Sequence, residues 1–218
     1  MPLSGIIFDM DGVLCDSEPF IAAAAIEMFR QNYGIGATRA DFAPFVGAGE
    51  DRFIGGVADK YHVKLTMPGD KARTYELYLE MIRGKLQPLP GAVPFIHDCR
   101  GKGLKIAVAT SADRVKLVGN LQQIGVPADT FDAVVTGDDV ERKKPDPQVF
   151  LLAAQRLNLP PAECVVIEDA PNGIRAGKAA GSRCLGITTT FDIHTLREAG
   201  ADWTAPDLAH VPPETFAG

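Results

Sequence analysis

The sequence predicts an α/β protein in which a doubly wound parallel sheet carries an inserted helical segment. Five aliphatic runs are nearly continuous and do not alternate with polar residues, as expected of parallel strands covered on both faces. These runs span residues 4–9, 104–111, 131–137, 163–169 and 183–189. Helical patterns lie between successive runs, and strands that alternate with helices are typical of a doubly wound sheet.

The helices expected between the later strands have recognisable ends. They span residues 92–101, 113–124, 147–157 and 171–180. Gly125 and Gly181 follow the second and the fourth of these stretches, and glycine is a common helix stop. The third stretch opens with a proline, which is compatible with the first turn of a helix.

One interval breaks this alternation, because only helical patterns occur between the first two strands. The first pattern, in residues 17–34, has Ser17 as its expected N-cap and Gly34 as its stop. The second, in residues 70–86, has an apolar face, and the segment "QPLPG" that follows resembles a hinge. We therefore predict a core formed by residues 1–16 and 88–218 and a helical cap formed by residues 17–87.

Composition excludes several classes of protein. The net charge is −6 and no basic patch suggests nucleic acid as a partner. No apolar run approaches the ~20 residues of a membrane helix, and no basic segment suggests a signal peptide, so we expect a soluble, cytoplasmic protein. No heptad pattern requires a partner, so we expect a monomer. Four widely spaced cysteines (Cys15, Cys99, Cys164 and Cys184) are expected to be reduced packing residues.

Polar residues gather where the predicted strands end. Parallel strands point their carboxyl ends to one edge of a sheet, where α/β proteins bind ligands. Acidic, hydroxyl and lysine side chains follow the strands at Asp9, Asp11, Thr110, Ser111, Lys144, Glu168 and Asp169. Two aspartates one residue apart repel each other unless water or a cation separates them. The sequence therefore predicts a charged site at this edge.

These residue types suit phosphoryl transfer. Four carboxylates, from Asp9, Asp11, Glu168 and Asp169, form an all-oxygen set that suits Mg²⁺. Hydroxyl and N–H groups of residues 110–111, expected at a helix start, could hold an anion, and Lys144 adds a positive charge. A carboxylate can act as a nucleophile, while a second acid protonates the leaving oxygen and then activates water.

The motifs resemble the haloacid dehalogenase superfamily along essentially the whole chain. "FDMDGVL", "ATS", "KKPDP" and "VIEDAPNGIRAG" are similar to its four motifs and occur in its order. The helical insert resembles the small type-1 cap of the β-phosphoglucomutase-like branch. The cap segment "PFVGAGEDRFIGGVA" is also similar to the corresponding domain of the plant suppressor-of-quenching protein. The resemblance implies a Rossmann-like core and a Mg²⁺-dependent phosphatase acting on a small phosphorylated metabolite such as a sugar phosphate.

The resemblance also implies a role for each matching residue. Asp9 would be the nucleophile and a Mg²⁺ ligand, and Asp11 the general acid/base, with its backbone carbonyl on the metal. Thr110 would hydrogen-bond the phosphoryl group, with Ser111 beside it, and Lys144 would neutralise the nucleophile and the phosphate. Glu168 and Asp169 would hold the metal.

Alternative functions stay open at this point. In β-phosphoglucomutases a histidine stands at the position of Ile21, and an arginine stands near that of Glu50. Both are absent here, which favours hydrolysis over a mutase. Dehalogenases of the family need no metal and no second aspartate, so the intact acidic set argues against dehalogenation. A non-catalytic phosphate-binding module would tolerate loss of the nucleophile. It would bind its ligand stoichiometrically, without turnover.

The cap decides which substrate fits. Gly47 and Gly49 are expected to shape a loop that closes over the site, since "GAGEDR" follows no strand and lacks a third glycine for dinucleotide binding. On that loop, Arg52 is the candidate for contact with the part of the substrate far from its phosphate.

Overall fold

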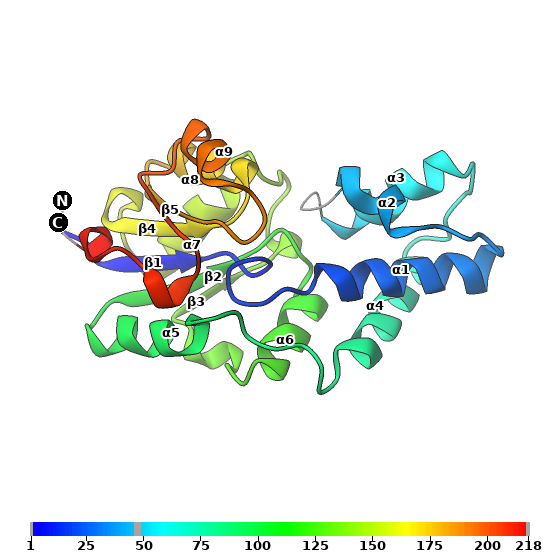
Figure 1. Ribbon diagram of the computed structural model, residues 1–218, viewed down its shortest axis with the longest axis horizontal. Helices are drawn as coiled ribbons and strands as arrows, with labels where there is room; N and C mark the ends of the chain where they lie inside the picture. The colour runs from blue at the N-terminus through cyan, green and yellow to red at the C-terminus, as the bar shows by residue number, and fades with distance from the viewer. Residues whose placement is uncertain (1, 46–48, 217–218) are drawn as a thin grey trace.

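The computed structural model describes residues 2–45 and 49–216, and a parallel sheet of six strands forms its centre (Figure 1). The strand order is β3-β2-β1-β4-β5-β6, and every neighbouring pair is parallel. The strands are β1 (Gly5–Phe8), β2 (Lys105–Ala109), β3 (Ala133–Val135), β4 (Cys164–Glu168), β5 (Arg183–Ile187) and β6 (Trp203–Ala205). Phe8 pairs with Val108 and with Ile167. The chain therefore leaves β1 between the ends of β2 and β4.

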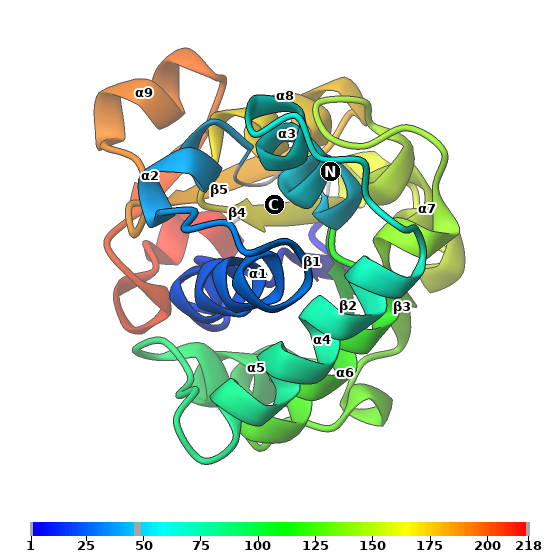
Figure 2. The same ribbon diagram turned by 90° about the vertical axis from the view of Figure 1, so that its right-hand side faces the viewer.

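Helices cover both faces of the sheet (Figure 2). Successive residues of a strand point to opposite faces. Ile6 and Phe8 therefore belong to the core on the side of α5 (Ala92–Gly101) and α6 (Arg114–Gln123). Ile7 belongs to the core on the other side. That second core also contains residues of α7 (Gln148–Leu157), α8 (Pro171–Ala179) and α9 (Ile193–Glu198). This double cover explains why the strand sequences are aliphatic throughout.

Four α-helices lie between β1 and α5 in the described part of the chain. They are α1 (Glu18–Tyr33), α2 (Arg39–Phe42), α3 (Glu50–Lys60) and α4 (Gly69–Ile82). They lie together at one end of the molecule, with α1 and α4 side by side (Figure 1). Gly34 ends α1 as predicted, with a φ of 67°. The division into core (1–16, 88–218) and cap (17–87) stays a prediction, and all four helices fall within the range predicted for the cap.

The two connections between the sheet and these helices pair with each other. Cys15 forms a β-bridge with Pro88, and the Leu89 N–H donates to the Leu14 carbonyl at 2.9 Å. The chain that leaves β1 and the chain that returns to α5 therefore run side by side.

The five predicted strands and the four helices of residues 92–180 are confirmed, and their ends differ by at most three residues. Both long helices of the insert are also confirmed. Residues 50–60 were expected to begin in a loop but form α3. Three further elements were not predicted, namely α2, α9 and β6. Ser17 occupies the N-cap position of α1, but its hydroxyl does not cap the helix. It donates instead to the Asp11 carboxylate, which lies within its reach.

Two expectations from composition concern the whole chain. All four cysteines are free and buried, as predicted. Among residues 2–45 and 49–216, no helix combines the length and the apolar character needed to cross a membrane.

Candidate active site

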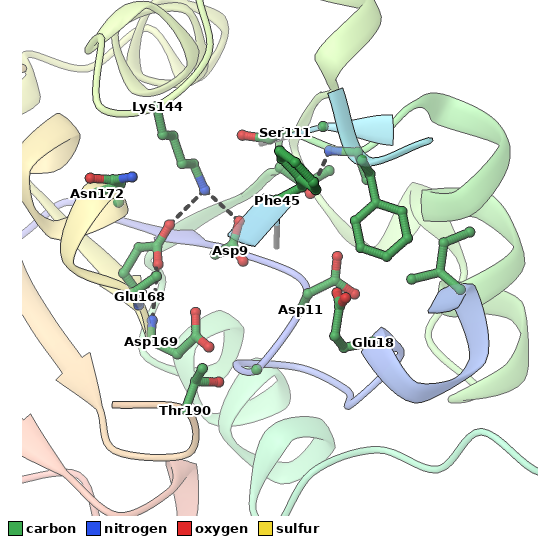
Figure 3. A pocket seen from close by; sticks show the side chains of 18 of the residues that line it. Asp9, Asp11, Glu18, Phe45, Ser111, Lys144, Glu168, Asp169, Asn172 and Thr190 are labelled. Carbon is green, nitrogen blue, oxygen red and sulfur yellow. Dashed lines mark hydrogen bonds and ion pairs between the residues drawn. The ribbon is translucent and has the colours of Figure 1, made fainter. Parts of the chain in front are cut away.

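Seven of the eight predicted site residues meet in one cavity at the carboxyl ends of the strands (Figure 3). The cavity has a volume of about 690 Å³. Residues of the core line it together with residues of α1 and α3. Its lining includes Asp9, Asp11, Thr110, Ser111, Lys144, Glu168 and Asp169.

Lys144 holds two carboxylates at the floor of this cavity. Its Nζ lies 2.5 Å from Asp9 Oδ1 and 2.6 Å from Glu168 Oε1 (Figure 3). The lysine side chain is only 7% exposed. Burial alone would lower the pKa of Lys144, but the charges of Asp9 and Glu168 raise it above its usual value. The lysine therefore stays charged and fixes the direction of both carboxylates.

Asp9, Glu168 and Asp169 form a group that fits a divalent cation. Each offers a carboxylate oxygen, and these oxygens lie within 4.8 Å of one another. All three residues are buried. Burial and the charges of neighbouring carboxylates raise the pKa of Asp9 to about 7 and raise that of Asp169 well above its usual value. A hard dication would relieve this repulsion, and three buried carboxylates are ligands that Mg²⁺ accepts.

Two glycines allow the backbone to approach these carboxylates. At Gly12, which has a φ of 76°, a Cβ atom would stand 1.9 Å from Asp169 Oδ2. At Gly173, in the first turn of α8, a Cβ atom would stand 1.8 Å from Glu168 Oε1. The "DG" of the first motif and the "NG" of the fourth motif thus make room for the acidic group.

Asp11 lies beside this group, and both of its oxygens accept hydrogen bonds. The Ser17 hydroxyl donates to Oδ1, and Lys116 Nζ donates to Oδ2 at 2.8 Å. Its side chain is 27% exposed, so it can still meet a ligand in the cavity. The three carboxylates of the metal group do not include that of Asp11.

Thr110 and Ser111 lie in the loop after β2 and not at a helix start, since α6 begins only at Arg114. The helix predicted over residues 113–124 starts within one residue of the expected position, so Thr110 and Ser111 precede its first turn. Thr110 Oγ1 accepts the Ala112 N–H at 3.1 Å, which shapes the loop. The Ser111 hydroxyl is buried, lines the cavity and has no hydrogen-bond partner in the part of the chain that the structure describes. The loop can therefore still offer hydroxyl groups to an anion.

Arg52 is not brought to the cavity with the other predicted residues. It lies within α3, because helix formation from Glu50 includes it, and it is not among the lining residues. Its guanidinium lies over the Phe45 ring at 5.1 Å and 3.6 Å from an Asp59 oxygen. Gly49 lines the cavity and precedes α3, whereas Gly47 lies outside the described residues.

The charged residues of the cavity that sequence reasoning missed include Lys116, Glu18 and Glu50. Lys116 on α6 is buried, and its Nζ contacts Asp11 and, at 3.6 Å, Glu50 Oε1. Burial alone would lower the pKa of Lys116, but the charges of Asp11 and Glu50 hold it well above its usual value. Burial raises the pKa of Glu18 to about 7, against the charge of Lys116, and burial also raises the pKa of Glu50. The sequence gives little sign of this arrangement. Val115 and Val118 would be expected to face the core, but they are exposed, and Lys116 between them is buried.

The fold and the site define an enzyme that acts on phosphate esters. Buried carboxylates, a lysine and free hydroxyls converge at the sheet edge where α/β enzymes bind their ligands. The chain belongs to the haloacid dehalogenase-like hydrolases, whose family model matches residues 3–181. This confirms the resemblance seen in the motifs, and two relatives of the chain are named as phosphatases.

Several known proteins are similar over nearly the whole chain. The chloroplastic protein SUPPRESSOR OF QUENCHING 1 of Arabidopsis thaliana is 42% identical over 96% of this chain. This chain matches only 20% of that longer protein. The phosphorylated carbohydrates phosphatase of Thermotoga maritima is 31% identical, with 97% of this chain and 95% of that protein covered. The crystal structure of CbbY from Rhodobacter sphaeroides with phosphate is 29% identical, covers 95% of each chain and has a TM-score of 0.83.

Proposed function

We propose that the chain hydrolyses the phosphate ester of a small metabolite, in particular a sugar phosphate, through a covalent phosphate on Asp9. The observation that carries this proposal is the contact of Lys144 with Asp9 and Glu168 within the acidic group at the cavity floor. Support for the substrate class comes from the Thermotoga relative, which is named for phosphorylated carbohydrates.

In this mechanism an Asp9 oxygen forms a bond to phosphorus as the bond from phosphorus to the leaving oxygen breaks. Asp11 gives its proton to the leaving oxygen and then takes one from the attacking water, which releases phosphate and restores Asp9. Lys144 holds the carboxylate of Asp9 toward the substrate. The hydroxyls of Thr110 and Ser111 hold the phosphoryl oxygens.

Mg²⁺ is the proposed cofactor, with Asp9, Glu168, Asp169 and the backbone carbonyl of Asp11 as its ligands. When bound, Mg²⁺ offsets the negative charge that the phosphoryl group and the carboxylates bring together.

The experiment that tests this function measures phosphate release from a panel of phosphomonoesters, with Mg²⁺ and with a chelator. We expect metal-dependent turnover that is lost in Asp9→Asn and kept in Asp98→Asn, a matched change at an exposed position of α5. Acid-quenched wild-type enzyme should carry phosphate by mass spectrometry, and Asp9→Asn should carry none. Turnover that survives in Asp9→Asn would exclude the covalent step.

A phosphosugar mutase is the rival within the same family. Ile21, which is buried and lines the cavity, offers no polar group to hold a phosphorylated intermediate while it turns. Phosphorus NMR of the products separates the two activities. A hydrolase yields inorganic phosphate, and a mutase yields an isomeric phosphate ester.

A further inference from the structure

The part of the cavity beyond Asp11 is lined by two more carboxylates. Glu18 begins α1, and Glu50 begins α3, and both face the cavity that contains Asp9. Apolar residues surround them, among them Ile21, Phe45 and Phe53. Figure 3 shows Glu18 on the same side of Asp9 as Asp11, away from Lys144. Neither glutamate has a role in the mechanism proposed above.

Glu50 has an unused hydrogen-bond acceptor inside this cavity. The residue is only 6% exposed, and its Oε2 atom is buried and has no hydrogen-bond partner among residues 2–45 and 49–216. Buried carboxylate oxygens are nearly always paired, because an unpaired one loses its hydration without compensation. Burial raises the pKa of Glu50, whereas the charge of Lys116, 3.6 Å from the other oxygen, opposes that shift. The buried Tyr75 hydroxyl interacts with Glu50, and a donor from a ligand can pair with the remaining acceptor capacity of Oε2.

The cations of the cavity are already engaged elsewhere. Among the described residues that line it, only Lys116, Lys144 and Arg175 carry a positive charge. Lys116 is shared by Asp11 and Glu50, and Lys144 by Asp9 and Glu168. Arg175 is exposed on α8 and hydrogen-bonds Asn172. A second anionic group near Glu50 would meet its carboxylate without a free cation beside it.

Lys116 also relates Glu50 to the reacting atoms. Its single ammonium group contacts both Asp11 and Glu50, so the two carboxylates lie on either side of one nitrogen atom. Asp11 is the residue proposed to protonate the leaving oxygen. Glu50 therefore faces the part of the leaving group that lies just beyond that oxygen.

We infer that Glu50 is a specificity-determining residue that selects phosphate esters whose leaving group offers a hydrogen-bond donor, a hydroxyl or an ammonium, and rejects those with a second anionic group. This inference rests on the proposed phosphatase function and adds the chemistry of the leaving group. Both donors satisfy the free oxygen of Glu50, and an ammonium also offsets its charge. A carboxylate or second phosphate adds like-charge repulsion in a buried setting.

One matched set of esters and one set of sugar phosphates test the inference. Hydroxyethyl phosphate, phosphoethanolamine and phosphoglycolate share a two-carbon skeleton and end in a hydroxyl, an ammonium and a carboxylate. Glucose 6-phosphate and glucosamine 6-phosphate carry a hydroxyl and an ammonium at C2 of a ring, and 6-phosphogluconate carries a carboxylate at C1 of an open six-carbon chain. We expect kcat/KM for the carboxylate ester of each set to be at least about tenfold below that of its partners. The hydroxyl and ammonium esters show which donor is preferred.

Glu50→Gln tests whether Glu50 causes this preference among the esters. Glu80→Gln is the matched change at an exposed position of α4. We expect Glu50→Gln to reduce the ratio of ammonium to carboxylate turnover by about tenfold, because like-charge repulsion is lost. Glu80→Gln should keep the wild-type ratio. Thermal melting of each variant shows that it is folded. The order of kcat/KM among the esters in the wild-type enzyme tests the inference without any variant.

The outcomes separate this inference from the proposed function. No release from any ester with Mg²⁺ present overturns the proposed function and the inference with it. Release led by a carboxylate ester overturns the inference alone. An equal loss on all esters in Glu50→Gln also overturns it, since Glu50 then acts only on the general arrangement of the site.

Discussion

Lys116→Met tests whether the buried lysine holds the helical insert against the core. Lys116 lies on α6 of the core, and its partner Glu50 begins α3 of the insert. Methionine keeps an unbranched side chain of similar length and removes the charge. The lysine side chain is 4% exposed, so water cannot replace its contacts. Its removal leaves the carboxylates of Asp11 and Glu50 facing each other.

The size of the effect follows from the two distances. At an effective dielectric constant of ~20, contacts of 2.8 Å with Asp11 and 3.6 Å with Glu50 give about 6 and about 5 kcal/mol of attraction. Desolvation of the buried charges offsets most of this attraction. Loss of one partner from a buried ion pair lowers the free energy of unfolding by about 3–5 kcal/mol. Asp11 is 27% exposed and can rehydrate, so we expect about 3 kcal/mol.

Urea unfolding and thermal melting without Mg²⁺ measure this loss, with Trp203 as the single tryptophan reporting on the sheet. A loss of about 3 kcal/mol corresponds to a fall in Tm of about 6–12 °C for a chain of this size. Lys64→Met, at an exposed lysine, should stay within about 0.5 kcal/mol of wild type. Adding Glu50→Gln to Lys116→Met should restore about 1–2 kcal/mol, because one unpaired charge is removed. A loss below about 1 kcal/mol in Lys116→Met, or no restoration, would refute the reasoning.

Three further predictions concern the metal group and acid stability. Gly173→Ala should weaken Mg²⁺ binding at least about tenfold by calorimetry, because the added Cβ displaces Glu168. Ala72→Gly on α4 is the control and should leave Mg²⁺ binding unchanged. Mg²⁺ should raise the Tm of wild type and not that of Asp169→Asn, since only the native acidic group binds it. Burial alone would raise the pKa of Asp139, but hydrogen bonds from Arg156 and Thr136 lower it to about 2. Its stabilisation is therefore present above pH about 4 and lost as pH falls toward 2, and Asp139→Asn should flatten that part of the urea-unfolding profile.

The sequence predicted the parts of the fold that repeat a simple pattern. Aliphatic runs covered on both faces revealed five strands, whereas β6 has only three residues, "WTA", and is too short for a pattern. Residues 50–60 were expected to begin in a loop because glycines precede them. An amphipathic helix nevertheless starts directly after Gly49.

The site was predictable where residues follow strand ends and not where tertiary contacts create it. Six of the predicted residues lie within three positions of the ends of β1, β2 and β4, so topology alone brings them together: Asp9, Asp11, Thr110, Ser111, Glu168 and Asp169. Lys144 joins them from the loop after β3. Lys116 acquires its importance only when α6 packs near α3 and buries it beside Glu50. Arg52 was chosen by charge and proximity in sequence, and the turn of α3 directs it to Phe45 and Asp59 instead.

The position of β1 in the sheet has a consequence for how the protein is made. β1 leaves the ribosome before its neighbours, yet it lies between β2 and β4. At a synthesis rate of about 5–20 residues per second, the roughly 160 residues that separate Asp9 from Glu168 require about 10–30 s. During that time the nascent chain has its nucleophile without the fourth motif, and Lys144 is made only in the last part of the interval. Catalytic competence therefore arises in one late step, when β4 completes the centre of the sheet.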